Sequence, residues 1–263
     1  MQVLIIGFGY VGKHLVKEAV SRGYKVWATS RNTENFPEIT KAGATPLLFG
    51  DLLPEGLTHI LVTTPPQDGK DPFLKTYTGK LPKTLEWLGY YSTTGVYGDA
   101  QGNWVNEESH LGAKNERALA RIACETEYKT TTVPLAIMRL SGIYGDDKNT
   151  LQRLKDGKQS LPEEAGPICR IHVDDIVTLT LGLMEQRLTG IFNISDDAPA
   201  STRSTVLEAC KKLNIDPMTL PQSNNMSKGF GGEGFRKVEN QKIKEALQTE
   251  LKYPSFTDFL KTV

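Results

Sequence analysis

The chain has 263 residues, with 31 basic and 31 acidic side chains and a formal net charge of zero. This balance argues against a nucleic acid or a membrane surface as a partner, because such partners select proteins with basic faces. The length is enough for a substantial core, arranged as one large domain or two closely packed ones.

The apolar runs and the cysteines narrow the class of protein further. No apolar run approaches the length of a transmembrane helix, and the first expected strand starts at residue 2, which leaves no room for a signal peptide. We therefore expect a cytoplasmic protein. The three cysteines are scattered and lack C-x-x-C spacing, and the four histidines lack ligand spacing, so we expect neither a disulfide nor a metal site.

Residues 3–12 read VLIIGFGYVG, a buried strand that runs into a glycine-rich turn. A helix is expected over 13–20, with Gly23 as its C-terminal cap. Strand, G-x-G-x-x-G and helix in this order form the dinucleotide-binding fingerprint, in which Gly7 permits the tight turn, Gly9 lets the backbone approach a pyrophosphate and Gly12 allows close helix–strand packing. The expected cofactor-binding residues of this loop are Gly7, Phe8, Gly9, Tyr10, Val11 and Gly12.

The end of the second expected strand, 25–31, indicates the type of cofactor. NAD-binding sites usually place Asp or Glu here, on the ribose 2′-hydroxyl. This chain has Ser30 and Arg31 instead, a hydroxyl and a guanidinium that suit a 2′-phosphate. The sequence therefore favours NADP over NAD, and the alternative is that Arg31 is a solvated loop residue.

Two further strand ends add cofactor candidates. A short helix over 39–42 and a strand over 45–49 precede Asp51, which is placed either to reach the adenine or to form a turn. The strand over 59–66 stops at two prolines, and its exit lies at the carboxyl edge of the sheet, where α/β folds hold ligands. The candidates at that exit are Thr63, Thr64 and Pro65.

A fifth strand, 88–92, ends in the hydroxyl-rich run that begins with Thr93 and Thr94, a suitable place for substrate chemistry. The segment 67–80 is expected to be a loop with at most a short helix, and 83–87 a short helical piece. The remaining elements are expected as loop 100–112, helix 114–128, strand 134–140, helix 151–155, loop 157–166, strand 168–173, helix 176–185 with Asp174 and Asp175 as its cap, strand 190–195, helix 204–213 and a last helix 238–247.

Several stretches together resemble the extended short-chain dehydrogenase/reductase superfamily, in its NAD-dependent epimerase/dehydratase group. In chain order they are the loop 7–12, Gly50-Asp51, STTGVYG (92–98), RLSGIYG (139–145), IHVDD (171–175), FNISDD (192–197) and KYPSF (252–256). The resemblance covers nearly the whole chain. More narrowly, Pro65-Pro66 and the residues of the stretch 92–98 resemble those of an atypical branch of bacterial epimerase-like proteins.

The resemblance implies an α/β fold: a Rossmann doubly wound parallel sheet with helices on both faces, and a small C-terminal substrate lobe. The expected division is a nucleotide-binding domain over 1–165, its sheet completed by parts of 166–200, and a mainly substrate-binding lobe over 166–263. Family members often form dimers, so a homodimer is a candidate assembly.

The resemblance breaks at the family's Y-x-x-x-K pair, whose tyrosine moves the proton while the lysine binds the ribose and lowers the pKa of the tyrosine. Alignment on Glu125 puts Arg117 at the tyrosine position and Arg121 at the lysine position. Arginine stays protonated near neutral pH, so Arg117 cannot act as acid or base, although it can hold an anion. The alternative is that Arg121 and Glu125 form a surface ion pair.

The resemblance also assigns the remaining candidates. Thr93 is at the family's catalytic Ser/Thr position, or is a strand-end threonine that bonds to backbone. Tyr97 is the nearest phenol if a proton donor is needed, although the equivalent tyrosine of the family is usually architectural. Arg121 is a cofactor candidate, and the substrate candidates are Thr94, Arg117, Arg139 and Arg170.

These observations support three hypotheses for the function. The first is an NADP-dependent oxidoreductase or epimerase that acts on a sugar-like or other small polar carbonyl or alcohol substrate, with a non-standard proton donor. The second is a non-catalytic NADP(H)-binding redox sensor or scaffold, which the missing Tyr and Lys suggest. The third, a lyase or isomerase that uses a bound cofactor transiently, cannot be separated from the first by sequence.

Overall fold

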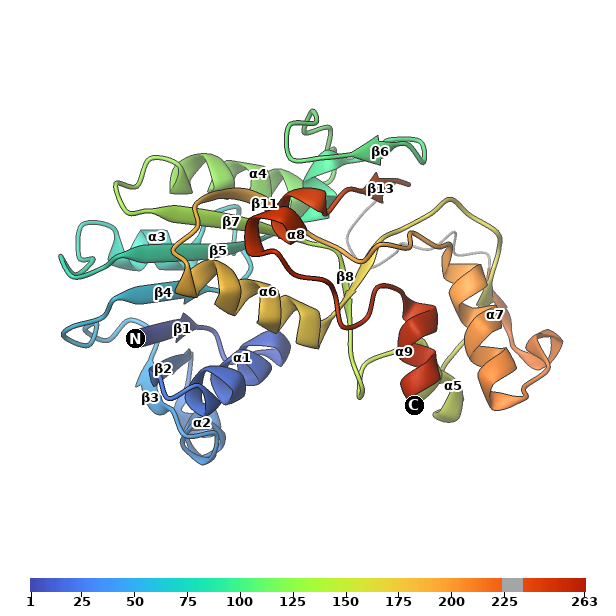
Figure 1. Cartoon of the computed structure of the whole chain (residues 1–263), viewed down its shortest axis with the longest axis horizontal. Coiled ribbons are helices and arrows are strands. Elements are labelled where there is room, and N and C mark those ends of the chain that lie inside the picture. Colours follow the sequence, from blue (N-terminus) through green and yellow to red (C-terminus); the bar gives the residue numbers. More distant parts are fainter. Residues whose placement is uncertain (224–233) are drawn as a thin grey trace. The chain divides into compact units, whose positions relative to one another are not determined.

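The computed structural model describes residues 1–223 and 234–263. The chain forms two compact units that interleave along the sequence (Figure 1). Unit 1 comprises Met1–Ser92, Leu119–Arg139 and Ile176–Phe192, and unit 2 comprises Thr93–Ala118, Leu140–Asp175 and Asn193–Val263.

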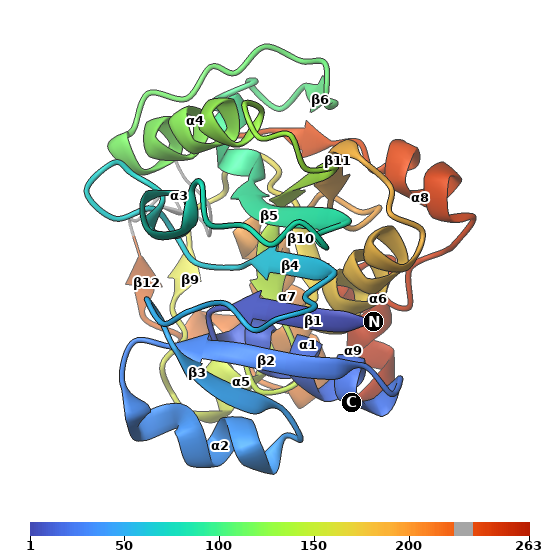
Figure 2. The same cartoon turned by 90° about the vertical axis from the view of Figure 1, so that its left-hand side faces the viewer.

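A seven-stranded sheet organises unit 1, with the strand order β11-β7-β5-β4-β1-β2-β3. Its strands are β1 (Gln2–Ile6), β2 (Lys25–Ser30), β3 (Thr45–Leu48), β4 (His59–Val62), β5 (Trp87–Thr93), β7 (Leu135–Leu140) and β11 (Gly190–Ile194). Strand β1 pairs in parallel with both β2 and β4, and Figure 2 shows these strands side by side. The predicted Rossmann-like α/β sheet is confirmed.

Helices cover both faces of this sheet. The helices of its layers are α1 (Tyr10–Ser21), α2 (Phe36–Lys41), α3 (Pro72–Tyr77), α4 (Glu116–Tyr128) and α6 (Val173–Glu185). Two successive residues of β5 show the alternation: the Tyr90 ring stacks on Tyr128 of α4, whereas the Tyr91 hydroxyl bonds to Thr180 of α6 at 2.7 Å. Successive side chains of a strand point to opposite faces, so α4 and α6 cover opposite faces.

The first helix ends as its sequence predicts. Gly23 has a φ of 78°, which glycine adopts without strain. Its N–H donates to the Val20 carbonyl, and the N–H of Tyr24 donates to the Ala19 carbonyl. This pair of bonds is the Schellman arrangement, and the predicted C-terminal glycine cap is confirmed.

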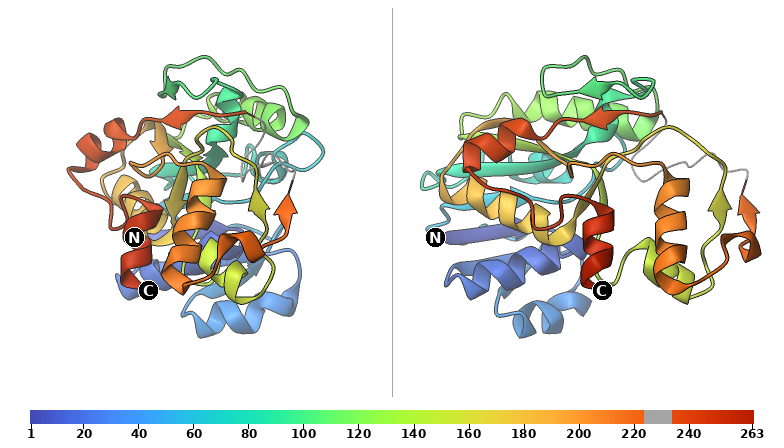
Figure 3. Two further views of the ribbon diagram at one scale, coloured as in Figure 1. Left: turned by 90° about the vertical axis from the view of Figure 1, so that its right-hand side faces the viewer. Right: turned by 45° about the vertical axis from the view of Figure 1, so that its right-hand side comes forward.

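Unit 2 is built from short elements around its own core. Its strands pair as β6 (Trp104–Val105) with β13 (Lys237–Val238), β8 (Gly142–Tyr144) with β10 (Arg170–His172), and β9 (Leu161–Pro162) with β12 (Gln222–Ser223). Its helices are α5 (Thr150–Lys155), α7 (Thr202–Leu213), α8 (Gln241–Leu247) and α9 (Phe256–Thr262). Tyr144, Val206 and Phe259 belong to one buried cluster that joins β8, α7 and α9; α7 is orange and α9 red in Figure 3.

Three predictions about the elements are wrong. The expected helical piece over 83–87 is a turn followed by the start of β5, because the N–H groups of Glu86 and Trp87 both donate to the Thr58 carbonyl. The helix expected from Ile176 begins at Val173, and the Asp175 carboxylate accepts the backbone N–H groups of residues 252 and 253 instead of capping α6. The helix expected from residue 238 begins at residue 241, because residue 238 pairs in β13.

Several elements of unit 2 were not anticipated: α9 and the strands β6, β8, β9 and β12. These strands have two or three residues each, which is too short for a recognisable alternation of apolar and polar residues.

Within the two described segments of the chain, none of the helices combines the length and apolarity needed to cross a membrane.

Candidate functional site

A cavity of about 360 Å³ opens in unit 1 where β1, β2, β3 and β4 end. The loops that follow these strands line it, with the residues Gly7, Phe8, Gly9, Thr29, Ser30, Arg31, Asn35, Phe49, Thr63, Thr64, Pro65, Gln67 and Pro72. Eight of the expected cofactor residues therefore lie together: Gly7, Phe8, Gly9, Ser30, Arg31, Thr63, Thr64 and Pro65. Tyr10, Val11, Gly12, Asp51 and Arg121 are not among the lining residues.

Two of the three loop glycines are required by the packing of the chain itself. Gly7 has a φ of 103°, and a Cβ there would lie 2.8 Å from both the Thr63 Oγ1 and a methyl carbon of Thr64. A Cβ on Gly12 would lie 2.2 Å from the Gly7 carbonyl oxygen. The turn and the start of α1 could not approach each other this closely with any larger residue at either position.

Gly9 is different, because the fold itself does not require a glycine there. Its φ of −82° and ψ of −165° are open to other residues, and no atom lies within 4 Å of a Cβ built on it. It is the N-cap of α1, so the N–H groups of the first turn have no side-chain cap, and that turn holds no acidic residue. An uncapped helix start that faces a cavity can accept an anion.

The polar wall of the cavity comes from the segment after β2. The Ser30 hydroxyl accepts a hydrogen bond from the Asn35 side chain at 3.0 Å. Arg31 is exposed, and no carboxylate of residues 1–223 or 234–263 lies within ion-pair distance of it. None of the lining residues is acidic. A ligand that carries a negative charge at this wall therefore meets a guanidinium without a competing carboxylate.

Five lining residues escaped the sequence analysis: Thr29, Asn35, Phe49, Gln67 and Pro72. Asn35 is the last residue of a 3₁₀ turn, Thr33–Asn35, which brings its side chain within hydrogen-bond distance of Ser30. In the sequence, Asn32, whose side chain caps this turn, was the available signal for it.

Asp51 is exposed beyond β3, and its N–H donates to the Leu48 carbonyl in a turn.

Arg121 is committed to the scaffold beneath the cavity. Its guanidinium donates to the Tyr91 carbonyl at 2.6 Å, the Tyr90 hydroxyl at 2.9 Å and the Thr64 carbonyl at 3.3 Å. Because Thr64 lines the cavity, Arg121 braces one wall of it. Burial raises the pKa of Tyr90 although the charge of Arg121 opposes this, so the phenol stays protonated near neutral pH. The predicted Arg121–Glu125 surface pair is wrong.

Glu125 instead forms a buried ion pair with Arg139. The guanidinium donates to the two carboxylate oxygens at 2.8 and 3.1 Å, and the Ser92 hydroxyl donates to the same carboxylate at 2.5 Å. The side chains of Arg139 and Glu125 are only 2% and 1% exposed. Arg139, expected beside the substrate, thus ties β7 to α4 and β5 within unit 1.

Three candidate hydroxyls lie at the end of β5 or just after it. The half-buried Thr93 ends the strand, and its oxygen accepts the N–H of Gly95 at 3.1 Å, the backbone contact of the alternative reading. Its own hydroxyl hydrogen can still be donated to a ligand. The buried Thr94 hydroxyl lies 3.5 Å from that of Ser141, and the buried Tyr97 hydroxyl donates to Asn193 at 2.7 Å.

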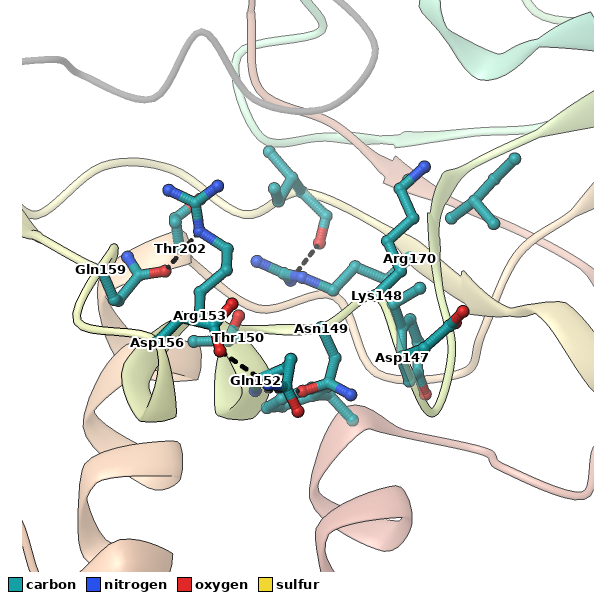
Figure 4. Close-up of a pocket in the computed structure, with 15 residues that line it drawn as sticks. Asp147, Lys148, Asn149, Thr150, Gln152, Arg153, Asp156, Gln159, Arg170 and Thr202 are labelled. Carbon is teal, nitrogen blue, oxygen red and sulfur yellow. Dashed lines mark hydrogen bonds between the residues drawn. The ribbon is translucent and has the colours of Figure 1, made fainter. Parts of the chain in front are cut away.

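The two remaining arginine candidates, Arg117 and Arg170, are not among the lining residues of the unit 1 cavity. Arg117 is exposed in the first turn of α4. Arg170 lines a second cavity, of about 400 Å³, that is formed within unit 2 (Figure 4). Arg153 and Thr202 line the same cavity, and the sequence analysis singled out neither of them.

The comparisons with known proteins fit this architecture. No protein-family model matches the chain. A conserved protein of unknown function from Silicibacter pomeroyi DSS has a solved structure that matches with a TM-score of 0.90 and 31% sequence identity, over 99% of this chain and 97% of that one. The human epimerase family protein SDR39U1 (isoform 2), solved with NADPH, matches with a TM-score of 0.79 and 15% identity, over 100% and 98% of the two chains.

Among curated proteins, a 3-diazoavenalumate denitrifying reductase from a Streptomyces species is 26% identical in an alignment 257 residues long that covers 84% of each chain. Together with the motifs and the sheet order, these matches confirm the resemblance drawn from the sequence. The chain belongs to one family with the Silicibacter pomeroyi protein, and its fold is that of the epimerase/dehydratase group of the extended short-chain dehydrogenase/reductase superfamily.

Proposed function

We propose that this protein is an NAD(P)-dependent oxidoreductase or epimerase that binds its nucleotide in the unit 1 cavity. The observation that carries the proposal is Gly9. The fold would accept a side chain at this position, yet the residue is a glycine at the uncapped start of α1, beside the cavity. A pyrophosphate needs this combination of open backbone and free helix N–H groups.

The rest of the cavity suits a dinucleotide, and NADP is favoured over NAD. The loop 7–12 would hold the pyrophosphate, and Ser30, Arg31 and Asn35 would hold a 2′-phosphate. The support for NADP is that Arg31 lines a cavity without acidic lining residues, whereas an NAD site usually offers a carboxylate to the ribose. The human protein with a similar fold was solved with NADPH.

The reaction we propose is hydride exchange with a sugar-like or other small polar carbonyl or alcohol substrate. A bound nicotinamide ring would supply the hydride donor or acceptor. The Thr93 hydroxyl, at the carboxyl end of β5, would donate to the reacting oxygen and orient it. Arg117 cannot exchange a proton near neutral pH, so the proton passes through a water or another group, for which Tyr97 is a candidate. Unit 2 would carry substrate recognition.

The first test is a calorimetric titration of the purified protein with NADP, NADPH, NAD and NADH. We expect tighter binding of the two 2′-phosphorylated forms, and loss of this preference in Arg31→Ala. Arg187→Ala is the matched control, because Arg187 is an exposed arginine of unit 1 that pairs with Glu86 outside the cavity. Absence of binding by all four nucleotides would overturn the proposal.

A second function, a non-catalytic NADP(H) sensor or scaffold, is favoured by the altered catalytic helix. The position of the family's lysine is occupied by Arg121, whose Nη1 donates to Thr64, Tyr90 and Tyr91. A sensor would bind NADP and NADPH with unequal affinity and turn over no substrate of a broad carbonyl and alcohol panel. Substrate-dependent change of NADPH absorbance, lost in Thr93→Ala, would instead establish the enzyme.

A further inference from the structure

The unit 2 cavity holds two arginines that come from different elements. Arg170 belongs to β10 and Arg153 to α5, and Figure 4 shows both side chains extending into the space between these elements. Ile143, Ile168 and Phe256 supply apolar lining. The cavity, of about 400 Å³, is large enough for a small organic molecule.

The hydrogen-bond acceptors of the two guanidinium groups are all uncharged. Arg170 donates from Nη1 to the Ala200 carbonyl at 2.9 Å and more weakly to the Ile168 carbonyl at 3.5 Å. Arg153 donates to the Gln159 side chain at 3.0 Å and to the Lys158 carbonyl at 3.1 Å. In the part of the chain that the structure describes, neither guanidinium has a carboxylate oxygen within 4.0 Å, and Nε and Nη2 of Arg170 have no acceptor.

The acid beside Arg170, Asp196, bonds to its backbone and forms no ion pair with its guanidinium. Asp196 is buried and accepts the backbone N–H of Arg170 at 3.4 Å. Burial raises the pKa of Asp196 to about 8, so this carboxyl is mostly neutral at pH 7. Burial also lowers the pKa of Arg170, the sign of a cation that lacks full compensation. An anion in the cavity would relieve this cost.

A buried hydroxyl at the same cavity also lacks a partner. The Oγ1 of Thr202, the first residue of α7, has no hydrogen-bond partner among the described residues. Buried polar groups rarely remain unpaired unless a ligand or water completes them. The two guanidinium groups and this hydroxyl suit the oxygen atoms of an anion. Lys148 adds a third cation to the lining, and Asp147 and Asp156 are its two acidic residues.

We propose that the unit 2 cavity binds a small organic anion, a carboxylate or a phosphate monoester, through Arg153, Arg170 and Thr202. The apolar lining residues would contact the carbon skeleton.

The test uses three probes of similar shape in calorimetric titrations: phenyl phosphate, benzoate and uncharged benzyl alcohol. We expect at least one of the two anions to bind and benzyl alcohol not to bind. The anion that binds more tightly shows whether the cavity prefers a phosphate or a carboxylate. Arg153→Gln weakens this binding about tenfold or more, because a charged hydrogen-bond donor is lost. Arg187→Gln, an exposed arginine outside the cavity, leaves it unchanged. Arg170→Gln weakens binding of the same anion equally. Because Arg170 is largely buried, the circular dichroism spectrum of this variant is compared with that of the wild type to show that it folds.

Two outcomes overturn the proposal. One is that neither anion binds. The other is that binding survives Arg153→Gln and is lost in Arg31→Gln, which would locate the probe in the unit 1 cavity. The nucleotide titration separates this inference from the proposed function: anion binding that responds to Arg153→Gln in a protein that binds no nucleotide would retain the anion site and refute the oxidoreductase.

Discussion

Gly12 lies so close to Gly7 that a Cβ on Gly12 would be 2.2 Å from the Gly7 carbonyl oxygen. The carbonyl oxygen is a backbone atom and the position of a Cβ is fixed by the backbone, so no side-chain rotation can relieve a clash. Gly9, between them in sequence, has no atom within 4 Å of the same hypothetical Cβ. Two glycines of one motif are thus constrained by the fold, and the third is open to a ligand.

Gly12→Ala and Gly9→Ala should therefore differ sharply. Gly12→Ala forces the turn away from α1 and should destabilise the protein by about 3 kcal/mol. Gly9→Ala should leave the free energy of unfolding within about 1 kcal/mol of the wild type, because its backbone conformation is allowed and the space is open. It should nevertheless weaken NADPH binding about tenfold or more, since the methyl group occupies the place of a phosphate.

Urea unfolding and NADPH titration of the two variants measure these effects. A destabilised Gly9→Ala, or one that binds NADPH as well as the wild type, would contradict the assignment of Gly9 to the ligand.

Removing one member of the buried pair Glu125–Arg139 should be strongly destabilising. Arg139→Ala leaves the Glu125 carboxylate buried without its cation, although it still accepts the Ser92 hydroxyl, and the loss should be about 3–5 kcal/mol. The double variant Glu125→Leu/Arg139→Met should recover much of this loss, because no charge then stays buried. Urea unfolding of the single and double variants checks both values; additive losses would show that the pair is not coupled.

Thr93 offers a test of the chemistry. Thr93→Ala should lower kcat about 100-fold with a small change in KM, because the proposed hydrogen bond orients the reacting oxygen. Thr93→Ser keeps the hydroxyl and should retain most of the activity. Steady-state NADPH absorbance assays compare the two variants, and equal activity of Thr93→Ala and the wild type would remove Thr93 from the mechanism.

The buried Asp196 predicts a pH dependence of stability. Its pKa is about 8 in the folded protein and near 3.9 when unfolded, so the folded state retains the proton over this interval. Stability should therefore fall as pH rises from about 4 to about 8 and level off above that. Asp196→Asn keeps an acceptor for the Arg170 N–H and lacks the titration, so its stability relative to the wild type should rise over the same interval.

Urea unfolding at several pH values between 4 and 9 measures this difference. A constant difference between Asp196→Asn and the wild type would mean that the carboxyl titrates normally in the folded state.

The arginines show most clearly which side-chain positions can be predicted from the sequence. Arg31 follows a strand in the fingerprint, and the structure places it at the unit 1 cavity as expected. Arg139 is the next-to-last residue of β7, and its side chain is buried against Glu125. The chain order cannot distinguish the two, because whether a strand-end side chain meets a cavity or a carboxylate depends on the helix packed against it.

The sequence by itself determined the parallel sheet, the glycine turn and the family. These depend on local patterns: continuous apolar runs, helical spacing and glycines at positions where larger residues would clash. Only the tertiary structure decided which groups meet: Glu125 with Arg139, Arg121 with Thr64 and Tyr91, and Arg153 with Arg170 around one cavity. Such contacts join residues far apart in the chain, and pairing is settled by burial and by the demand of each buried polar group for a partner.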